Sequence, residues 1–224
     1  MIDKNTVFEL LGGRVSLWCG TDMDSVELAR AAQFATDNGV SVVSVAPNAV
    51  QTIWPWMENS AVKIMTRFYL DTKNITEKHI SDVTVRINAA LRQGAHGAQI
   101  FLPRVALPGL VEQTHVVRDD LFFNKDLSIG MDISDIGPFD WGTVFDNLRK
   151  INVSSVIMAF AEDAGNKSDF VGRVYAMLNA WGPENKFNLH FAFGPNFMRI
   201  EQALRLVQYM RPDLAGNMRF WVSF

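Results

Sequence analysis

The feature that most limits the fold of this 224-residue chain is a unit that recurs along its length. In each unit a short apolar run rich in Val, Ile and Phe is followed by a turn and usually by a longer amphipathic stretch. Such runs are typical of buried strands, and their alternation with helices predicts βαβ units in a parallel sheet. Eight runs fit a strand: 14–19, 41–46, 62–69, 98–103, 127–133, 155–161, 188–193 and 219–223.

Two architectures accommodate such a chain, a closed barrel and an open doubly wound sheet. The dinucleotide-binding form of the open sheet carries a G-x-G-x-x-G motif after its first strand. Here the first run leads instead into the sequence CGTD at 19–22. We therefore predict an α/β protein with a (β/α)8 TIM barrel, formed by residues 1–224 as a single domain of ordinary size for this fold.

The stretches between the runs have the spacing of amphipathic helices. Because the given sequence ends at Phe224, directly after the eighth run, the barrel is expected to lack its eighth helix. Residues 1–11 are expected to form an N-terminal helix that packs near this gap or over the bottom of the barrel. Helices are predicted over 25–38, 77–93, 110–123, 141–150, 168–181 and 199–210, with a short Trp-rich one over 50–59.

Composition excludes several classes of protein. A net charge of -3 gives no basic surface for a nucleic-acid backbone. The single cysteine, Cys19, cannot form an intrachain disulfide, and Asp3 and Glu9 occupy the segment where a signal peptide would be basic and apolar. No apolar stretch reaches the length of a membrane helix. We expect a cytoplasmic protein that binds neither nucleic acid nor membrane.

Strand alternation predicts which side chains enter the barrel, since successive residues point to opposite faces. In each of the clearest runs the apolar members would face the helices and the polar members the interior. The active sites of barrels lie at the C-terminal ends of the strands, so residues late in each run are the main candidates. Expected interior residues are Arg67, Gln99, Phe101, Ser128, Gly130, Asp132, Asn188, His190, Ala192, Trp221 and Ser223.

Asp132 and His190 are the leading candidates for acid–base chemistry, because a histidine beside an inward carboxylate titrates near neutral pH. They would lie two strands apart around the ring. The alternative is a buried polar pair that fills a barrel layer. Glu162 and Asp163 could add metal ligands, but no motif such as H-E-x-x-H supports a metal, and we expect neither metal nor cofactor. Arg67 would bind a carboxylate or phosphate, or else pair with Asp132.

Four short segments together suggest a family. Residues 42–47 (VVSVAP) are similar to a second strand reading Val-Cys-Val-Asn-Pro, and 62–64 (VKI) to a third strand opening Lys-Ile. Gly94-Ala95 precedes the fourth run as in Gly-Ala-x-Glu-Ile-Asp. Residues 127–134 are spaced like Leu-Lys-Val-Ile-x-Glu-Thr, with Asp132 at the Glu position. In the order of these segments the chain resembles the deoxyribose-phosphate aldolases, class I aldolases built on a (β/α)8 barrel.

The resemblance also shows what this chain has replaced. The family uses a lysine on the sixth strand to form a Schiff base, an aspartate on the fourth and a second lysine on the seventh. Here the sixth and seventh runs contain no lysine, and Gln99 stands at the aspartate position. Lys167, in the loop after the sixth run, is the nearest lysine. The family binds phosphate after strands seven and eight, where this chain has Gly194 and Ser223.

Two hypotheses follow. The first is an aldolase-like enzyme that acts, without an imine, on a small sugar-like or phosphorylated carbonyl compound. Its catalytic residues would be Asp132, His190 and Gln99, and its substrate-binding residues Arg67, Asn48, Gly194 and Ser223. The alternative is a non-catalytic barrel that serves as a binding or assembly subunit, and either form could be a homo-oligomer. An open mouth where Asp132, His190 and Arg67 converge would favour the enzyme. A barrel plugged by Phe101, Met158, Phe160 and Trp221 would favour the binding subunit.

Overall fold

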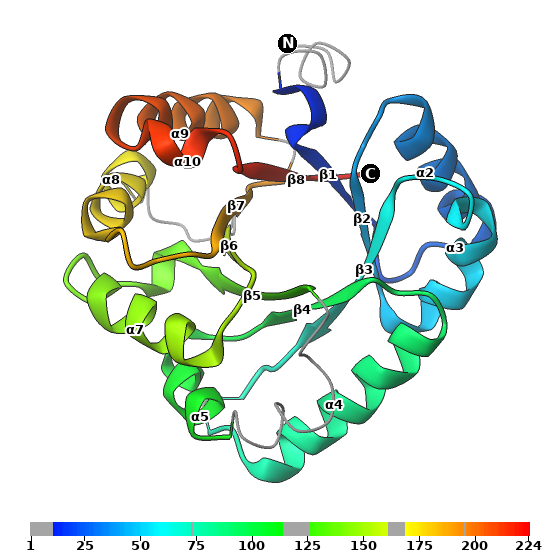
Figure 1. Ribbon diagram of the computed structural model, residues 1–224, viewed down its shortest axis with the longest axis horizontal. Helices are drawn as coiled ribbons and strands as arrows, with labels where there is room; N and C mark the ends of the chain where they lie inside the picture. The colour runs from blue at the N-terminus through cyan, green and yellow to red at the C-terminus, as the bar shows by residue number, and fades with distance from the viewer. Residues whose placement is uncertain (1–10, 73, 114–125, 161–168, 195) are drawn as a thin grey trace.

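Eight parallel strands close into a barrel in sequence order, and helices surround it (Figure 1). The computed structural model describes residues 11–72, 74–113, 126–160, 169–194 and 196–224. A closed ring confirms the (β/α)8 barrel and rules out the open sheet. The strands are β1 (Val15–Trp18), β2 (Val42–Val45), β3 (Lys63–Tyr69), β4 (Gly97–Phe101), β5 (Asp126–Asp132), β6 (Ser155–Ala159), β7 (Asn188–Ala192) and β8 (Arg219–Ser223).

The helices form the outer ring of Figure 1. Among the described residues, no helix is both long and apolar enough to span a bilayer. Residues 1–10 of the predicted N-terminal helix and residues 114–123 of the helix predicted over 110–123 lie outside the described residues. The helices are α2 (Ser25–Asp37), α3 (Val50–Met57), α4 (Glu77–Arg92), α5 (Leu107–Glu112), α7 (Trp141–Ile151), α8 (Phe170–Ala180), α9 (Phe197–Met210) and α10 (Pro212–Ala215), with short 3-10 turns η1 (Gly12–Arg14), η2 (Pro47–Ala49), η3 (Arg104–Ala106) and η4 (Ile133–Asp135).

Local sequence signals explain where helices begin and end. Helix α2 starts with a capping box, in which the Asp24 carboxylate accepts the Glu27 backbone N–H and the Glu27 side chain accepts that of Asp24. Helix α7 ends at Asn152, which takes the left-handed conformation with φ 60° and so stops the helix. These signals explain the start of α2 and the end of α7.

The barrel closes where β1 pairs in parallel with β8. Val15 lies opposite Phe220, and the pairing continues to Trp18 opposite Ser223. The backbone N–H of Phe224 then donates to the carbonyl oxygen of Trp18 at 3.1 Å. Closure removes both edges of the sheet and encloses a column of inward side chains.

The predicted alternation of the strands is confirmed. Leu127, Ile129 and Met131 of β5 are buried in the core between the barrel and the helices. Phe101 and Trp221, from β4 and β8, belong instead to a separate cluster inside the barrel. Leu189, Phe191 and Phe193 of β7 also pack in the outer core.

Of the four residues that could plug the barrel, Phe101 and Trp221 fill its interior, whereas Met158 and Phe160 do not. Both side chains pack in the outer core, where Phe160 meets Phe170 of α8 at a ring-centroid distance of 5.4 Å. The alternation of β6 explains this result, because it turns Ile157 and Ala159 inward and Met158 outward.

Gly130 provides a test of how tightly the interior is filled. A Cβ atom at this position would overlap the ring of Phe101, its neighbour on β4. We predict that Gly130→Ala lowers the free energy of unfolding by about 1–3 kcal/mol, because the added methyl group overpacks the interior. Urea denaturation followed by circular dichroism would measure the change.

Gly142 is the matched control, because a Cβ atom there meets nothing within 4 Å on an exposed face of α7. Gly142→Ala should leave the stability unchanged or raise it by about 0.5 kcal/mol. Equal effects of the two substitutions would show that the barrel interior is loosely packed.

Candidate functional site

The C-terminal ends of four neighbouring strands surround one cavity. Tyr69, Phe101, Asp132 and Ala159 are the last residues of β3, β4, β5 and β6, and all line a space of about 400 Å³. This is the end of a barrel at which enzymes of this fold place their chemistry. We call this space the C-terminal cavity.

Among the described residues, the charged side chains that line the C-terminal cavity are all acidic. Asp71, Asp132 and Asp135 line it, and the Asp132 carboxylate accepts the backbone N–H of Ser134 at 2.8 Å. Burial raises the pKa of Asp135, the charge of Asp132 raises it further, and Arg173 opposes both effects. Because carboxylates repel anions, this cavity is poorly suited to a phosphorylated ligand.

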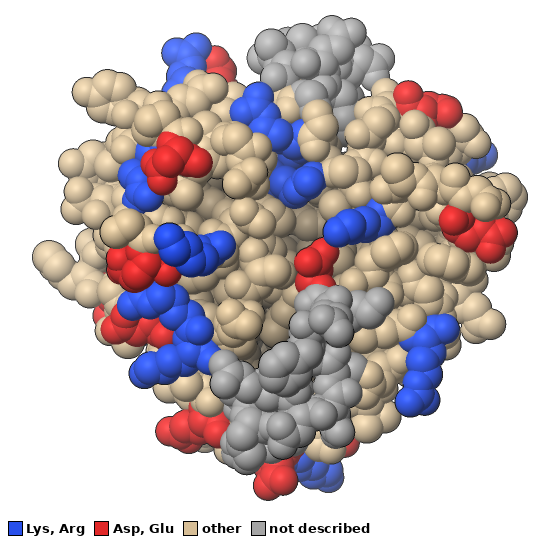
Figure 2. Space-filling view, in the orientation of Figure 1, with Lys and Arg blue, Asp and Glu red and all other residues tan. Residues whose placement is uncertain are grey.

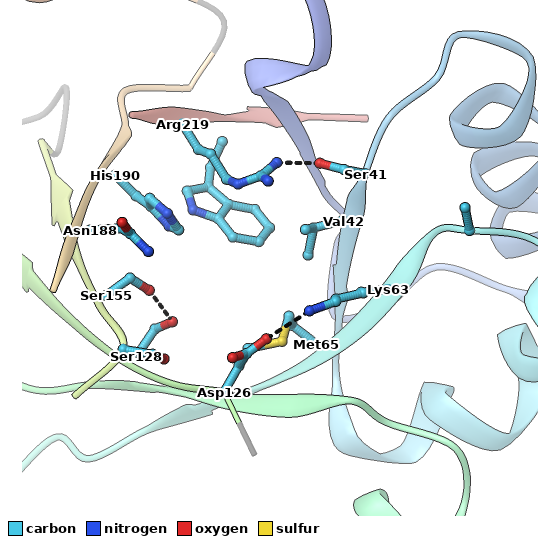
Figure 3. Close-up of a pocket in the computed structure, with 13 residues that line it drawn as sticks. Ser41, Val42, Lys63, Met65, Asp126, Ser128, Ser155, Asn188, His190 and Arg219 are labelled. Atoms are coloured by element: carbon cyan, nitrogen blue, oxygen red, sulfur yellow. Dashed lines mark hydrogen bonds and ion pairs between the residues drawn. The ribbon is translucent and has the colours of Figure 1, made fainter. Parts of the chain in front are cut away.

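A second cavity opens at the opposite end of the barrel, among the first residues of the strands. Lys63, Asp126, Asn188 and Arg219 begin β3, β5, β7 and β8 and line a space of about 320 Å³ (Figure 3). Lys63 and Asp126 form an ion pair with an N–O distance of 3.1 Å. We call this space the N-terminal cavity.

His190 lines the N-terminal cavity, so the structure does not bring it together with Asp132. Its ring is only 7% exposed, and its Nδ1 atom has no hydrogen-bond partner among the described residues. Burial lowers the pKa of His190 to about 3, and the positive charge of Arg219 adds to the effect. The expected acid–base pair would need a raised or near-neutral pKa, and the imidazole is instead neutral at physiological pH.

Between the two cavities the barrel is filled by five side chains, from Trp18, Arg67, Phe101, Ile157 and Trp221, which we call the interior plug. The guanidinium carbon of Arg67 lies 4.6 Å from the ring centroid of Trp18. The Trp18 ring contacts Phe101 at a centroid distance of 5.1 Å and Trp221 at 6.5 Å. The plug separates Asp132 from His190.

Arg67 is held by groups of the barrel itself. Its Nη2 donates to the carbonyl oxygen of Cys19 at 2.6 Å, and its Nη1 donates to Ser44 Oγ at 3.3 Å. Ser44 in turn donates to Gln99 Oε1 at 2.6 Å. Arg67 and Gln99 are 3% and 1% exposed, and neither residue lines either of the two cavities. Arg67 therefore serves as a buried structural cation here, and the pairing with Asp132 is not formed.

Cys19 closes the same network and is shielded from solvent. Its side chain is 0% exposed, and burial raises the pKa of the thiol to about 11 against the opposing charge of Arg67. The thiol stays protonated at neutral pH and is not a nucleophile.

The remaining expected site residues lie around the C-terminal rim. Asn48 is exposed in η2 after β2, Gly194 follows β7 with φ +61°, and Ser223 is the exposed last residue of β8. None of the three lines the C-terminal cavity as described. Glu162 and Asp163 lie outside the described residues, as does Lys167. The described part of the chain contains no group of three or more His, Cys, Asp or Glu side chains placed for a metal ion.

The N-terminal cavity was not anticipated from the sequence. Late positions in each strand were weighed as site residues, and the polar residues that open the strands were not. A signal was nevertheless present, because β3, β5, β7 and β8 begin with Lys63, Asp126, Asn188 and Arg219. A charged or amide residue at the first position of several strands is a pattern that can be recognised in a sequence, and it indicates a polar N-terminal end of the barrel.

The low pKa of His190 predicts a specific dependence of stability on pH. A histidine with a normal pKa near 6.5 when unfolded takes up a proton in the unfolded chain first, so the native state loses stability as the pH falls from 6.5 toward 3. Between pH 7 and pH 4 the wild-type protein should lose roughly 3 kcal/mol more than His190→Gln. Urea titrations of both proteins at the two pH values measure the difference. An identical pH dependence in both would contradict the burial of a neutral imidazole.

Comparisons with known proteins agree with this barrel. No known family profile matches the chain, and no curated protein matches it in sequence. Solved structures do match. A Coccidioides immitis protein provisionally assigned as a deoxyribose-phosphate aldolase superimposes with a TM-score of 0.73 and 10% identity, covering 96% of this chain and 82% of its own.

Two further structures give the same result. The tetrameric deoxyribose phosphate aldolase of Aeropyrum pernix has a TM-score of 0.70 and 11% identity, covering 96% of this chain and 87% of its own. An aldolase called QR15 has a TM-score of 0.69 and 11% identity, covering 94% and 91%. At such identities the likeness concerns the fold. The chain is thus an aldolase-like TIM barrel with the fold of the deoxyribose-phosphate aldolases.

Proposed function

We propose that this protein is a ligand-binding barrel that has kept the aldolase fold without the aldolase reaction. The interior plug carries the proposal, because it fills the space between Asp132 and His190. An acid and a base that act on one substrate must both reach it within hydrogen-bonding distance. Groups that line cavities at opposite ends of a filled barrel do not meet this requirement.

The chemistry of imine formation supports the same proposal. Only a primary amine forms the iminium on which class I aldolase chemistry depends. Strands β6 and β7 carry the sequences SVIMA and NLHFA, which contain no lysine. Gln99, at the position where the resemblance implies an aspartate, is bonded to Ser44 inside the plug. In the described part of the chain no lysine lines the C-terminal cavity, and Lys63 at the N-terminal cavity is paired with Asp126.

An enzyme acting at the C-terminal cavity is the second candidate, favoured by the pair Asp132 and Asp135. Both carboxyl groups line an open space at the catalytic end of the barrel, and burial raises the pKa of Asp135. In this alternative Asp135 would give a proton to a sugar-like carbonyl compound and Asp132 would accept one. His190 and Arg67 would then have no catalytic part.

Self-association forms part of the proposal. Trp56 on α3 is 61% exposed, and large exposed aromatic side chains are enriched at subunit interfaces. The structural neighbour from Aeropyrum pernix is a tetramer. In a homo-oligomer, a barrel that catalyses no reaction could still serve as a binding or assembly subunit.

Borohydride trapping tests the proposal. The purified protein is incubated with acetaldehyde or 2-deoxyribose 5-phosphate and sodium borohydride, and lysine adducts are sought by peptide mass spectrometry. We expect no single lysine to be labelled above the diffuse reductive alkylation that exposed lysines undergo with acetaldehyde and borohydride. We also expect no release of acetaldehyde from the sugar phosphate, because no lysine among the described residues lines the C-terminal cavity. A class I aldolase treated in parallel confirms that the trap works.

Two results would contradict the proposal in different ways. An adduct on Lys167 would show that the loop after β6 restores imine chemistry. Release of acetaldehyde without an adduct, lost in Asp132→Asn, would favour the carboxylate enzyme at the C-terminal cavity.

A further inference from the structure

The N-terminal cavity contains polar groups that the protein leaves unsatisfied. His190 and Trp221 both line it and are 7% and 2% exposed. Neither His190 Nδ1 nor Trp221 Nε1 has a hydrogen-bond partner among the described residues. Buried polar atoms without partners are costly, and a bound molecule or ordered water normally satisfies them. Two such atoms on residues that line one cavity point to a site that a bound molecule completes.

The charged groups of this cavity lie at its opening. Arg219 Nη1 donates to the hydroxyl of Ser41 and to the carbonyl oxygen of Gly13 at 3.3 Å, while its Nη2 and Nε have no partner among the described residues. A guanidinium presents five donors and binds a carboxylate through two of them. Viewed along the barrel, Lys and Arg side chains gather around a hollow near the centre of the face, with acidic side chains beside them (Figure 2).

The net charge of the N-terminal cavity indicates how many negative charges a bound anion should carry. Lys63 and Arg219 are positive and Asp126 is negative, and Lys63 is already paired with Asp126. The cavity therefore has one positive charge in excess, centred on Arg219. A ligand with a single negative charge neutralises it, whereas a phosphate monoester would bring close to two charges near Asp126.

The deeper wall favours hydroxyl or carbonyl groups on the ligand. Asn188 and His190 of β7 point into the cavity beside Ser155 and Ser128, whose hydroxyl groups bond to each other at 2.6 Å (Figure 3). The amide of Asn188 and the neutral imidazole of His190 can donate and accept hydrogen bonds. At about 320 Å³ the cavity is at the small end of the range for ligand pockets.

We propose that the N-terminal cavity binds a small hydroxy-monocarboxylate, with the carboxylate on Arg219 and the hydroxyl groups on Asn188, His190 and Trp221. This inference deepens the proposed binding function and rests on it. It places the ligand at the N-terminal end of the barrel. Enzymes of this fold carry out catalysis at the other end, where the C-terminal cavity lies.

Three probes of one carbon skeleton test the charge requirement by isothermal titration calorimetry. These probes are glycerate, glycerol and glycerol 3-phosphate, which carry one, no and about two negative charges. We expect glycerate to bind one to one and at least about tenfold more tightly than either of the others. Equal or tighter binding of glycerol or glycerol 3-phosphate would overturn the assignment of a monocarboxylate site, as would failure of glycerate to bind.

Variants and NMR locate the binding. Arg219→Gln should weaken glycerate at least about tenfold, and Asn188→Ala, at an exposed position, should weaken it about threefold or more. Arg205→Gln on α9 is the matched control, because its side chain is 77% exposed and distant in the fold from this cavity, and it should bind as wild type. In the wild-type protein the indole N–H signal of Trp221, identified with Trp221→Phe, should shift on addition of glycerate.

The outcomes separate this inference from the proposed function. Glycerate binding that leaves the Trp221 signal in place, or that Arg219→Gln does not weaken, overturns the N-terminal site and leaves the binding function standing. A trapped lysine or release of acetaldehyde overturns the proposed function even where the Trp221 signal shifts with glycerate.

Discussion

A guanidinium group inside a barrel loses its water, and the protein must supply acceptors and an aromatic face in its place. Arg67 is in this position. The Cys19 carbonyl, the Ser44 hydroxyl and the ring of Trp18 surround it, and Gln99 holds Ser44 in place. These groups come from the first four strands, so the buried cation ties one half of the barrel together. The same contacts fill the space in which a barrel enzyme would bind its substrate.

The consequence is a barrel with two separate mouths of different character. The C-terminal cavity is acidic, with Asp132 and Asp135 on its wall, and the N-terminal cavity carries an excess of positive charge at Arg219. Phe101 and Trp221 lie between them in one interior cluster. A fold that resembles an aldolase thus has two separate cavities, with the side chains of the plug between them. Function follows from the side chains that fill the barrel, and the fold alone does not determine it.

Much of this architecture could be predicted from the sequence, because strand direction and side-chain alternation are local properties. The inward positions of Gln99, Asp132 and His190 follow from a period of two. The position of a residue along the barrel axis is not a local property, because it depends on how neighbouring strands pair. Asp132 lies opposite Ala159, which lies opposite Ala192, whereas His190 pairs with Ile157 two residues earlier. Strand tilt and register increase the distance between Asp132 and His190 along the barrel axis. Two residues that both point into the barrel can therefore line cavities at its opposite ends.

The sequence named two members of the plug, Phe101 and Trp221, but not the part that Arg67 has in it. Arg67 had the residue type of an anion-binding group, and only its three-dimensional partners show that both of its terminal nitrogens donate to groups of the barrel. The polar residues that open the strands were visible, but the general location of barrel active sites drew attention to the other end. Their importance follows from unsatisfied atoms at His190 and Trp221, which are a property of packing.

Hydrogen exchange at the Arg67 side chain tests the central claim, a filled and dry plug between the two mouths. Arg67 Nε is fully buried, whereas the Arg205 side chain is 77% exposed. With the Arg67 signal identified from its loss in Arg67→Lys, NMR should show that the Nε–H of Arg67 exchanges with water about 100-fold more slowly than that of Arg205. Exchange of Arg67 as fast as that of Arg205 would mean that water crosses the barrel, and would contradict the account.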